Sequence, residues 1–361
     1  MSRAHKKDAA PQAAEELSIL DKLLEDHEQH QAEDDFINDV AVVFVGAKSS
    51  GKTTIADFFI KGGKEGSKVA PTVSLDYKYA RQKSSAMLAH IYEIGGGIES
   101  LIDIPISQHT VGNMVVIMTV DLSKPHSVIT DLVHWKDLLS KQIESSLRTL
   151  ATEGGNRGAK RVTDLERKRK DMFEMHQDFD KLEYMAVPMV IFGTHWDELA
   201  ASVDAEKRKT LCLALRYYAH KFGASLALTS SKDRDSMNVS RVILRQAIFN
   251  VAPKKDELNT QLSPSSPLCV MAGNDTLKDI GEFVGKDSSP QDFAAHHFPN
   301  SEQANAVEKA ADELPKEEAI DLVVEQRKQE LQKYILEAER KQRLASDEAA
   351  VLSLGGLVGA A

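Results

Sequence analysis

The sequence is poor in cysteine, in aromatic residues and in long apolar runs. Its 361 residues include only two cysteines, Cys212 and Cys269, which excludes the disulfide framework of a small secreted domain. A secretory signal has an apolar stretch after its basic residues, and the basic N-terminal segment of this chain has none. The most apolar internal run, Met114 to Leu122, is too short to cross a bilayer. We therefore expect a protein of the reducing cytoplasm without membrane insertion.

An excess of positive charge is also missing. Acidic residues outnumber basic ones by 55 to 45, and the formal net charge is −10. No global basic field is available to hold a phosphate backbone, so we expect no nucleic-acid partner. Histidines such as His126, His134, His195 and His220 show no zinc-ligand spacing with cysteines or carboxylates, and we expect them to be core or surface residues.

Apolar runs rich in β-branched residues alternate with helical patterns through the first two thirds of the chain. This alternation predicts a doubly wound, mostly parallel six-stranded sheet in an α/β domain. The expected strands are Val40 to Val45, Val73 to Tyr79, Met87 to Ile94, Met114 to Val120, Val187 to Phe192 and Ser225 to Leu228.

The flanking segments have different compositions, which predict the domain boundaries. We expect an N-terminal helical extension over residues 1–36 and the α/β domain over 37–252, with its core ending near Val251. Two helical stretches, Pro125 to Leu150 and Thr163 to Tyr184, are joined by a glycine-rich loop from Glu153 to Lys160, and the second is expected to be an insertion, at about 153–184. A Ser- and Pro-rich linker with short packed pieces follows over 253–310, then a charged helix over 311–348 and a disordered tail over 349–361. The apolar seam of the charged helix is either a partner surface or one side of a solvated helix.

The segment GAKSSGKT, from Gly46 to Thr53, matches the phosphate-binding loop pattern GxxxxGK followed by Ser or Thr. A buried strand precedes it and a helical pattern follows, which is the order that this loop requires. Glycine lets the backbone turn its N–H groups toward phosphate oxygens, and the helix N-terminus adds positive potential. The predicted nucleotide-binding residues here are Gly46, Ser49, Ser50, Gly51, Lys52, Thr53 and Thr54, with Lys52 on the β and γ phosphates. A loop that keeps this shape for packing alone is the alternative.

Further along the chain, three positions correspond to the magnesium and γ-phosphate elements of GTPases. Thr72 lies where a switch threonine would sense Mg²⁺, and Glu93 lies where such proteins carry Asp of Asp-x-x-Gly. Thr53, Thr72 and Glu93 are therefore the predicted Mg²⁺ ligands, conditional on a bound nucleotide, and Gly96 is a predicted γ-phosphate donor. Gly97 stands where a glutamine would orient water, so we expect slow or absent hydrolysis and assign no catalytic residue.

Base recognition is present only in part. Thr194-His195-Trp196-Asp197 follows the fifth expected strand, where guanine-binding proteins have Asn-Lys-x-Asp. Asp197 still offers a carboxylate to guanine donors, whereas Thr194 lacks the carboxamide. The turn after the sixth strand contributes Ser230, Ser231 and Lys232 as further predicted nucleotide-binding residues. GTP or GDP with Mg²⁺ is the expected cofactor. If no nucleotide binds, Asp197 would instead cap the helix that follows it, and Ser230 and Ser231 would only close a turn.

These stretches together resemble the light intermediate chains of cytoplasmic dynein, and among them the dynein-2 branch. The likeness runs from about Val40 to Val251 and is carried by VVFVGAKSSGKTTI, PTVSLDYKYARQ, IYEIGGGIESLIDIPIS, VDLSKP, VPMVIFGTHWD and LCLALRYYAHKFGASLALTSSK. The resemblance implies a Ras-like domain and an accessory subunit that binds and stabilises the dynein-2 heavy chain in retrograde intraflagellar transport and cilium assembly. It also implies contacts with other dynein-2 subunits and intraflagellar transport complexes, and a location in cytoplasm, cytoskeleton and cilium, including axoneme and basal body.

Two other functions are compatible with the residues. An active GTPase switch that regulates the motor is favoured by the intact Lys52 and Thr53. A small-molecule kinase with the same loop is disfavoured, because no arginine-rich lid sequence follows the core.

Overall fold

The computed structural model describes residues 39–62, 70–82, 87–254 and 257–281, together with residue 298 and six residues of a C-terminal helix, 326, 327, 329, 330, 333 and 334. The chain divides into one compact unit, Met1–Pro299, and a second, Asn300–Ala361. The expected N-terminal helix and the tail lie outside the described residues, as does most of the charged C-terminal helix. In that helix Arg327 pairs with Glu330 at 2.8 Å, and Tyr334 is exposed.

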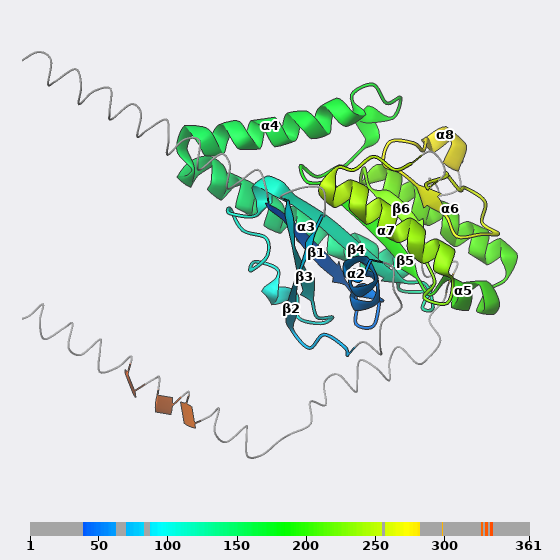
Figure 1. Cartoon of the computed structure of the whole chain (residues 1–361), viewed down its shortest axis with the longest axis horizontal. Coiled ribbons are helices and arrows are strands. Elements are labelled where there is room, and N and C mark those ends of the chain that lie inside the picture. Colours follow the sequence, from blue (N-terminus) through cyan, green and yellow to red (C-terminus); the bar gives the residue numbers. More distant parts are fainter. Residues whose placement is uncertain are drawn as a thin grey trace, which may run out of the picture. The chain divides into compact units, whose positions relative to one another are not determined.

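The first unit is built on a seven-stranded sheet in the order β2-β3-β1-β4-β5-β6-β7 (Figure 1). Its strands are β1 Asp39–Gly46, β2 Leu75–Arg81, β3 Leu88–Ile94, β4 Met114–Asp121, β5 Met189–Thr194, β6 Ser225–Leu228 and β7 Cys269–Val270. The pairs β2–β3 and β6–β7 are antiparallel, and the four pairs between them are parallel. The doubly wound, mostly parallel sheet expected from the sequence is therefore confirmed, with one further strand at its edge.

Helices cover both faces of this sheet, as parallel strands require (Figure 1). On one face α2 (Lys52–Ile60) and α7 (Arg234–Phe249) pack on side chains such as Phe44 and Phe192. On the other face α3 (Val128–Glu153), α5 (Trp196–Ser202) and α6 (Ala205–Lys221) pack on side chains such as Val43 and Ile191. β1, β4 and β5 are buried almost throughout because they lie between both helical layers.

The helical insertion differs in its boundaries from the expectation. Helix α4 spans Gly155–Phe173, so the glycine-rich segment is the start of a helix and not a loop, and the helix ends well before Tyr184. Gly158 permits this tight junction, since a Cβ at that position would collide with the carbonyl oxygen of Leu150 in α3. Short 3₁₀ turns complete the unit: η1 Glu99–Leu101, η2 Val111–Asn113 and η3 Phe179–Lys181.

Helix α4 lies at the amino-terminal ends of the central strands. Arg161 donates to the carbonyl of Gly112, just before β4. Arg169 donates to Met185 and Gly223, which precede β5 and β6. The insertion is therefore at the end of the sheet opposite to the loop that follows β1.

The packed core continues beyond Val251. Leu268 and Ile280 are buried, β7 pairs with β6, and α8 (Leu277–Ile280) packs near α6. Arg216 of α6 makes a bidentate, buried ion pair with Asp275, with N···O distances of 2.8 and 2.7 Å. Within the described part of the chain, no helix combines the length and apolar character needed to span a membrane.

Candidate nucleotide-binding site

The loop from Gly46 to Thr53 connects β1 to α2 at the carboxyl end of the sheet. Gly46 has φ 141° and Gly51 has φ 80°, and a Cβ at Gly46 would collide with the carbonyl oxygen of Thr119. Both positions therefore need glycine. Ser50 is fully buried and its hydroxyl hydrogen-bonds to that of Thr119 at 2.6 Å, which fixes the loop against β4. Ser49 has φ 64°, and Thr54 is exposed in the first turn of α2.

Lys52 lies inside the loop, with only 5% of its surface exposed. Its ammonium group donates to the carbonyl oxygens of Gly46 and Ala47, both at 2.8 Å. Burial lowers the pKa of Lys52 to about 8, and the nearby Glu93 carboxylate opposes this shift. The group thus stays mostly protonated at neutral pH, and a phosphate at the loop would stabilise its charge further.

The three predicted magnesium ligands lie together at the start of α2. The Thr53 hydroxyl donates to Oε1 of Glu93 and lies 3.4 Å from the hydroxyl of Thr72. Oε2 of Glu93 is buried without a hydrogen bond, although the ammonium of Lys78 lies 3.8 Å away. Two hydroxyls and a carboxylate form an all-oxygen donor set, which is the kind that Mg²⁺ takes. These residues fit the cation of a magnesium nucleotide.

Gly96 lies against the phosphate-binding loop. A Cβ at this position would collide with the backbone of Lys48, so only glycine fits there. Gly97, the next residue, has φ 89° and open space where a Cβ would be. In a GTPase a side chain at this position would orient a water molecule, and Gly97 has none.

Thr194 connects the end of β5 to the same loop. Its hydroxyl donates to the carbonyl oxygen of Ser50 at 3.0 Å and also lies 3.2 Å from that of Val120. A threonine hydroxyl thus ties the expected base-recognition turn to the phosphate loop, although it cannot act as a carboxamide toward a base.

His195 adopts a left-handed conformation, with φ 58°, and faces the end of β4. Its Nδ1 lies 2.8 Å from Oδ1 of Asp121. This hydrogen bond raises the pKa of His195 above its usual value. Burial alone would raise the pKa of Asp121, but hydrogen bonds from His195 and Ser123 outweigh it and lower that pKa. His195 stands where the lysine of Asn-Lys-x-Asp would lay its alkyl stem over a base, and its imidazole is held instead by the Asp121 carboxylate.

Asp197 is joined to the turn after β6. Its carboxylate accepts hydrogen bonds from the Ser230 hydroxyl at 2.6 Å and from the Lys232 ammonium at 2.7 Å. The bonds from Lys232 and Ser230 lower the pKa of Asp197, so it is ionised at neutral pH. Ser231 is exposed in the same turn. Three of the four predicted base-side residues are thus connected directly, and a guanine would have to compete with Ser230 and Lys232 for the carboxylate.

Three residues of this site were not singled out from the sequence: Thr119, Asp121 and Lys78. Asp121 follows directly after β4, and a polar residue at the carboxyl end of a parallel strand is a signal that could have indicated it. Thr119 and Lys78 act through contacts with residues about 70 and 15 positions away, which no local pattern reveals.

Comparisons with known proteins establish the family of this chain. A family model described as "Dynein light intermediate chain (DLIC)" matches residues 21–181. A "Cytoplasmic dynein 2 light intermediate chain 1" from Danio rerio is 32% identical over 279 residues, covering 74% of this chain and 74% of the relative. The chain belongs to the dynein light intermediate chain family.

Other relatives and a solved structure support the same assignment. Proteins of the same name from Bos taurus and Homo sapiens are 30% and 31% identical and cover 68% and 66% of this chain, and 68% and 67% of their own lengths. The fold matches "Crystal Structure of the Dynein Light Intermediate Chain's Conserved Domain" with a TM-score of 0.52 at 12% identity, over 71% of this chain and 89% of that one. The fold of this chain is therefore a Ras-like P-loop domain, to which α4 is an added helix.

Proposed function

We propose that this light intermediate chain is a non-catalytic accessory subunit of the cytoplasmic dynein-2 motor. In this role it binds and stabilises the dynein-2 heavy chain, and works with other dynein-2 subunits and intraflagellar transport complexes in retrograde transport and cilium assembly. The similarity to dynein-2 light intermediate chains over about three quarters of the chain carries the proposal. The protein would then be found in the cytoplasm and along the ciliary axoneme and basal body.

The nucleotide site has a structural task in this proposal. Lys52, Thr53, Thr72 and Glu93 would hold GTP or GDP with Mg²⁺, which would connect α2 to the β2–β3 side of the sheet. Position 97 supplies no group to orient an attacking water. Nucleotide binding at this site would therefore stabilise the folded domain and would not lead to GTP hydrolysis.

Heavy-chain binding is tested by affinity capture of the tagged protein from ciliated cells. We expect the dynein-2 heavy chain in the captured material, and lower heavy-chain abundance when the subunit is depleted. Capture without any dynein heavy chain would rule the proposal out.

Nucleotide holding is tested separately on the purified protein. Denaturation is expected to release about one guanine nucleotide per chain, and Lys52→Ala is expected to abolish this. Lys61→Ala is the matched control, because Lys61 is a partly exposed lysine just after α2 that pairs with Asp57 outside the loop. Equal nucleotide content in all three proteins would contradict the assignment of the loop.

An active GTPase switch is the second candidate, because the magnesium ligands lie together around Thr53. It predicts multiple turnovers of GTP, lost in Lys52→Ala and kept in Lys61→Ala. Our proposal predicts a rate below about 10⁻⁴ s⁻¹ for the native chain, which is slower than the intrinsic rate of a typical GTPase.

A further inference from the structure

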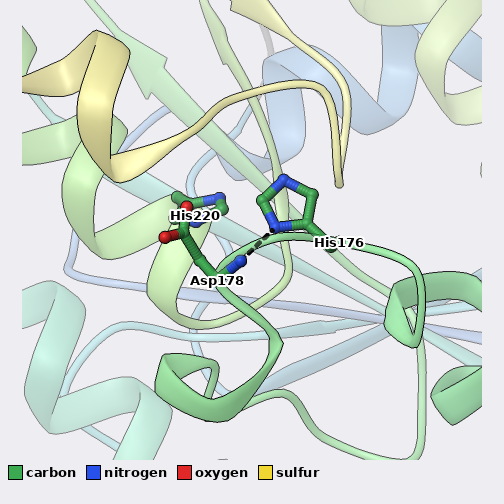
Figure 2. A group of neighbouring side chains, drawn as sticks. All are labelled: His176, Asp178 and His220. Carbon is green, nitrogen blue, oxygen red and sulfur yellow. Dashed lines mark hydrogen bonds and ion pairs between the residues drawn. The ribbon is translucent and has the colours of Figure 1, made fainter.

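Three potential metal ligands meet at the end of the sheet opposite to the phosphate loop. His176 and Asp178 lie in the connection between α4 and β5, and His220 lies in the last turn of α6. One ligand atom of each lies within 4.8 Å of the others. Figure 2 shows the Asp178 carboxylate beside His220, with the His176 ring facing both.

The hydrogen bonds of His176 determine which of its ring nitrogens can bind a cation. Its Nε2 lies 2.9 Å from the carbonyl oxygen of Asp275, and because a carbonyl only accepts, Nε2 carries the hydrogen. The lone pair is then on Nδ1, which accepts a 3.1 Å hydrogen bond from the backbone N–H of Asp178 (Figure 2). Metal-bound histidines usually donate one ring N–H to a backbone carbonyl in this way, and a cation at Nδ1 would replace the hydrogen bond from Asp178.

His220 is the least satisfied member of this cluster. Its side chain is 2% exposed, and its Nε2 is buried without a hydrogen-bond partner. The nearest carboxylate oxygen, Oδ2 of Asp178, lies 3.3 Å from this nitrogen. A cation at this point would give the buried Nε2 of His220 a partner.

Asp178 is oriented toward this point by the segment that follows β7. Its Oδ2 accepts a 2.9 Å hydrogen bond from the backbone N–H of Leu277, at the start of α8. The carbonyl of Asp275, two residues earlier, orients His176. The same short segment thus positions two of the three ligands, as outer partners of metal ligands do.

We propose that His176, Asp178 and His220 bind one Zn²⁺ ion through two imidazole nitrogens and one carboxylate oxygen. Two nitrogens and one oxygen suit Zn²⁺, which takes histidine and carboxylate ligands and has no geometric preference of its own. A water molecule would complete a tetrahedron. In this position the ion joins the α4–β5 connection to α6 and, through Asp275 and Leu277, stabilises the docking of α8.

The test uses the purified full chain, freed of metal by a chelator that is then removed. Titration with Zn²⁺ against a competing chromogenic chelator is expected to show one site per chain that is lost in the variants. The thermal unfolding temperature of the native chain is expected to rise by about 5 °C or more when Zn²⁺ is present at a hundredfold excess over Kd. Any rise caused by the same excess of Mg²⁺ is expected to be equal in the native chain and the variants, since Mg²⁺ prefers oxygen ligands and belongs to the proposed nucleotide site.

Two variants remove one ligand each. His176→Ala is expected to weaken Zn²⁺ binding at least about tenfold, since loss of an outer partner alone costs about 10–100-fold. Asp178→Asn keeps the size of the side chain and removes its charge. Its Zn²⁺ affinity therefore tests the site even if His176→Ala unfolds. His109→Ala, at an exposed histidine away from the cluster, is the control and is expected to bind as the native chain does.

The difference between the native chain and the variants is the decisive result, because ten of the twelve histidines lie outside the cluster and offer weak zinc sites. Equal Zn²⁺ affinity and equal thermal shifts in the native chain, Asp178→Asn and His109→Ala would overturn the proposal. Since the cluster and the phosphate loop are at opposite ends of the sheet, this outcome would leave the proposed nucleotide and motor functions unaffected.

Discussion

Single residues of the phosphate-binding loop have conformations that only glycine adopts easily. Gly46→Ala is expected to lower the free energy of unfolding by about 2–4 kcal/mol, combining strain at φ 141° with the collision at the Thr119 carbonyl. Urea unfolding measures this loss. Gly97→Ala is the matched control, because φ is 89° there but the space is open, so only about 1–2 kcal/mol of strain applies. Equal losses at the two positions would show that Gly46 is not tightly packed.

The His195–Asp121 pair predicts a pH dependence. The pKa of His195 is raised in the folded chain, so its contribution is fully present below its unfolded value of 6.5 and is lost as the pH rises through the folded value. The pKa of Asp121 is lowered, so its contribution is present above 3.8 and is lost at more acidic pH.

His195→Asn should therefore destabilise the protein more at pH 6 than at pH 8.5, by less than about 1 kcal/mol because the imidazole is partly exposed. Comparing urea midpoints of the native chain and the variant at the two pH values isolates this pair from the other histidines. A difference that stays constant with pH would contradict the assigned interaction.

At this scale, local spacing located the loop and the positions of Thr72, Glu93 and Asp197. The pairing of Thr194 with Ser50 and of His195 with Asp121 was not predictable, because each joins segments 74 or more residues apart whose approach depends on the sheet order. The same is true of the His176 cluster. A local spacing of histidines with cysteines or carboxylates does not reveal side chains that come together from two separate segments.

Among the elements, α4 is held to the domain in part by a buried arginine, Arg169. Arg169 donates to the carbonyls of Met185 and Gly223 at 3.2 and 3.0 Å and lies over the ring of Phe173. Burial lowers the pKa of this guanidinium to about 10, which leaves it charged at neutral pH.

Arg169→Met is expected to destabilise the protein by about 2–4 kcal/mol, since two buried carbonyls lose a charged donor while the alkyl packing is kept. Arg167→Met on the same helix is the control. Arg167 is exposed and makes an exposed ion pair with Asp164, so a change below about 0.5 kcal/mol is expected. Chemical denaturation of both variants gives the comparison, and similar losses would show that α4 is not anchored through position 169.

The boundaries of α4 show where pattern analysis stops at the level of elements. Glycines are turn signals in isolation, and the segment from Glu153 to Lys160 was expected to be a loop for that reason. In the folded chain the close approach of Gly158 to Leu150 makes a sharp junction between two helices. The tertiary contact, and not the intrinsic preference of glycine, determines the conformation.

For the whole molecule, six strands and a mostly parallel sheet follow from the alternation of buried runs with helices. The seventh strand could not be predicted, because two residues are too few to show a period. Its segment nevertheless contributes Leu268, Val270 and Ile280 to the core and supplies Asp275 to buried Arg216. The unit that folds is therefore larger than the region that ends at Val251.

A chain that ends at Val251 tests this conclusion. It loses three large buried side chains at about 1.5–3 kcal/mol each, exposes the edge of β6, and leaves Arg216 buried without its carboxylate at a cost of about 3–5 kcal/mol. Their sum approaches the whole stability of a typical domain, so we expect an aggregating protein without a cooperative thermal transition.

A chain that ends at Pro299 retains these contacts and buried Phe298, and is expected to unfold within a few degrees of the full chain. Adding Arg216→Met to the shorter chain removes the unpaired charge and should restore part of its soluble yield. If the chain ending at Val251 unfolded cooperatively at the temperature of the one ending at Pro299, the segment after α7 would be an attachment and not part of the core.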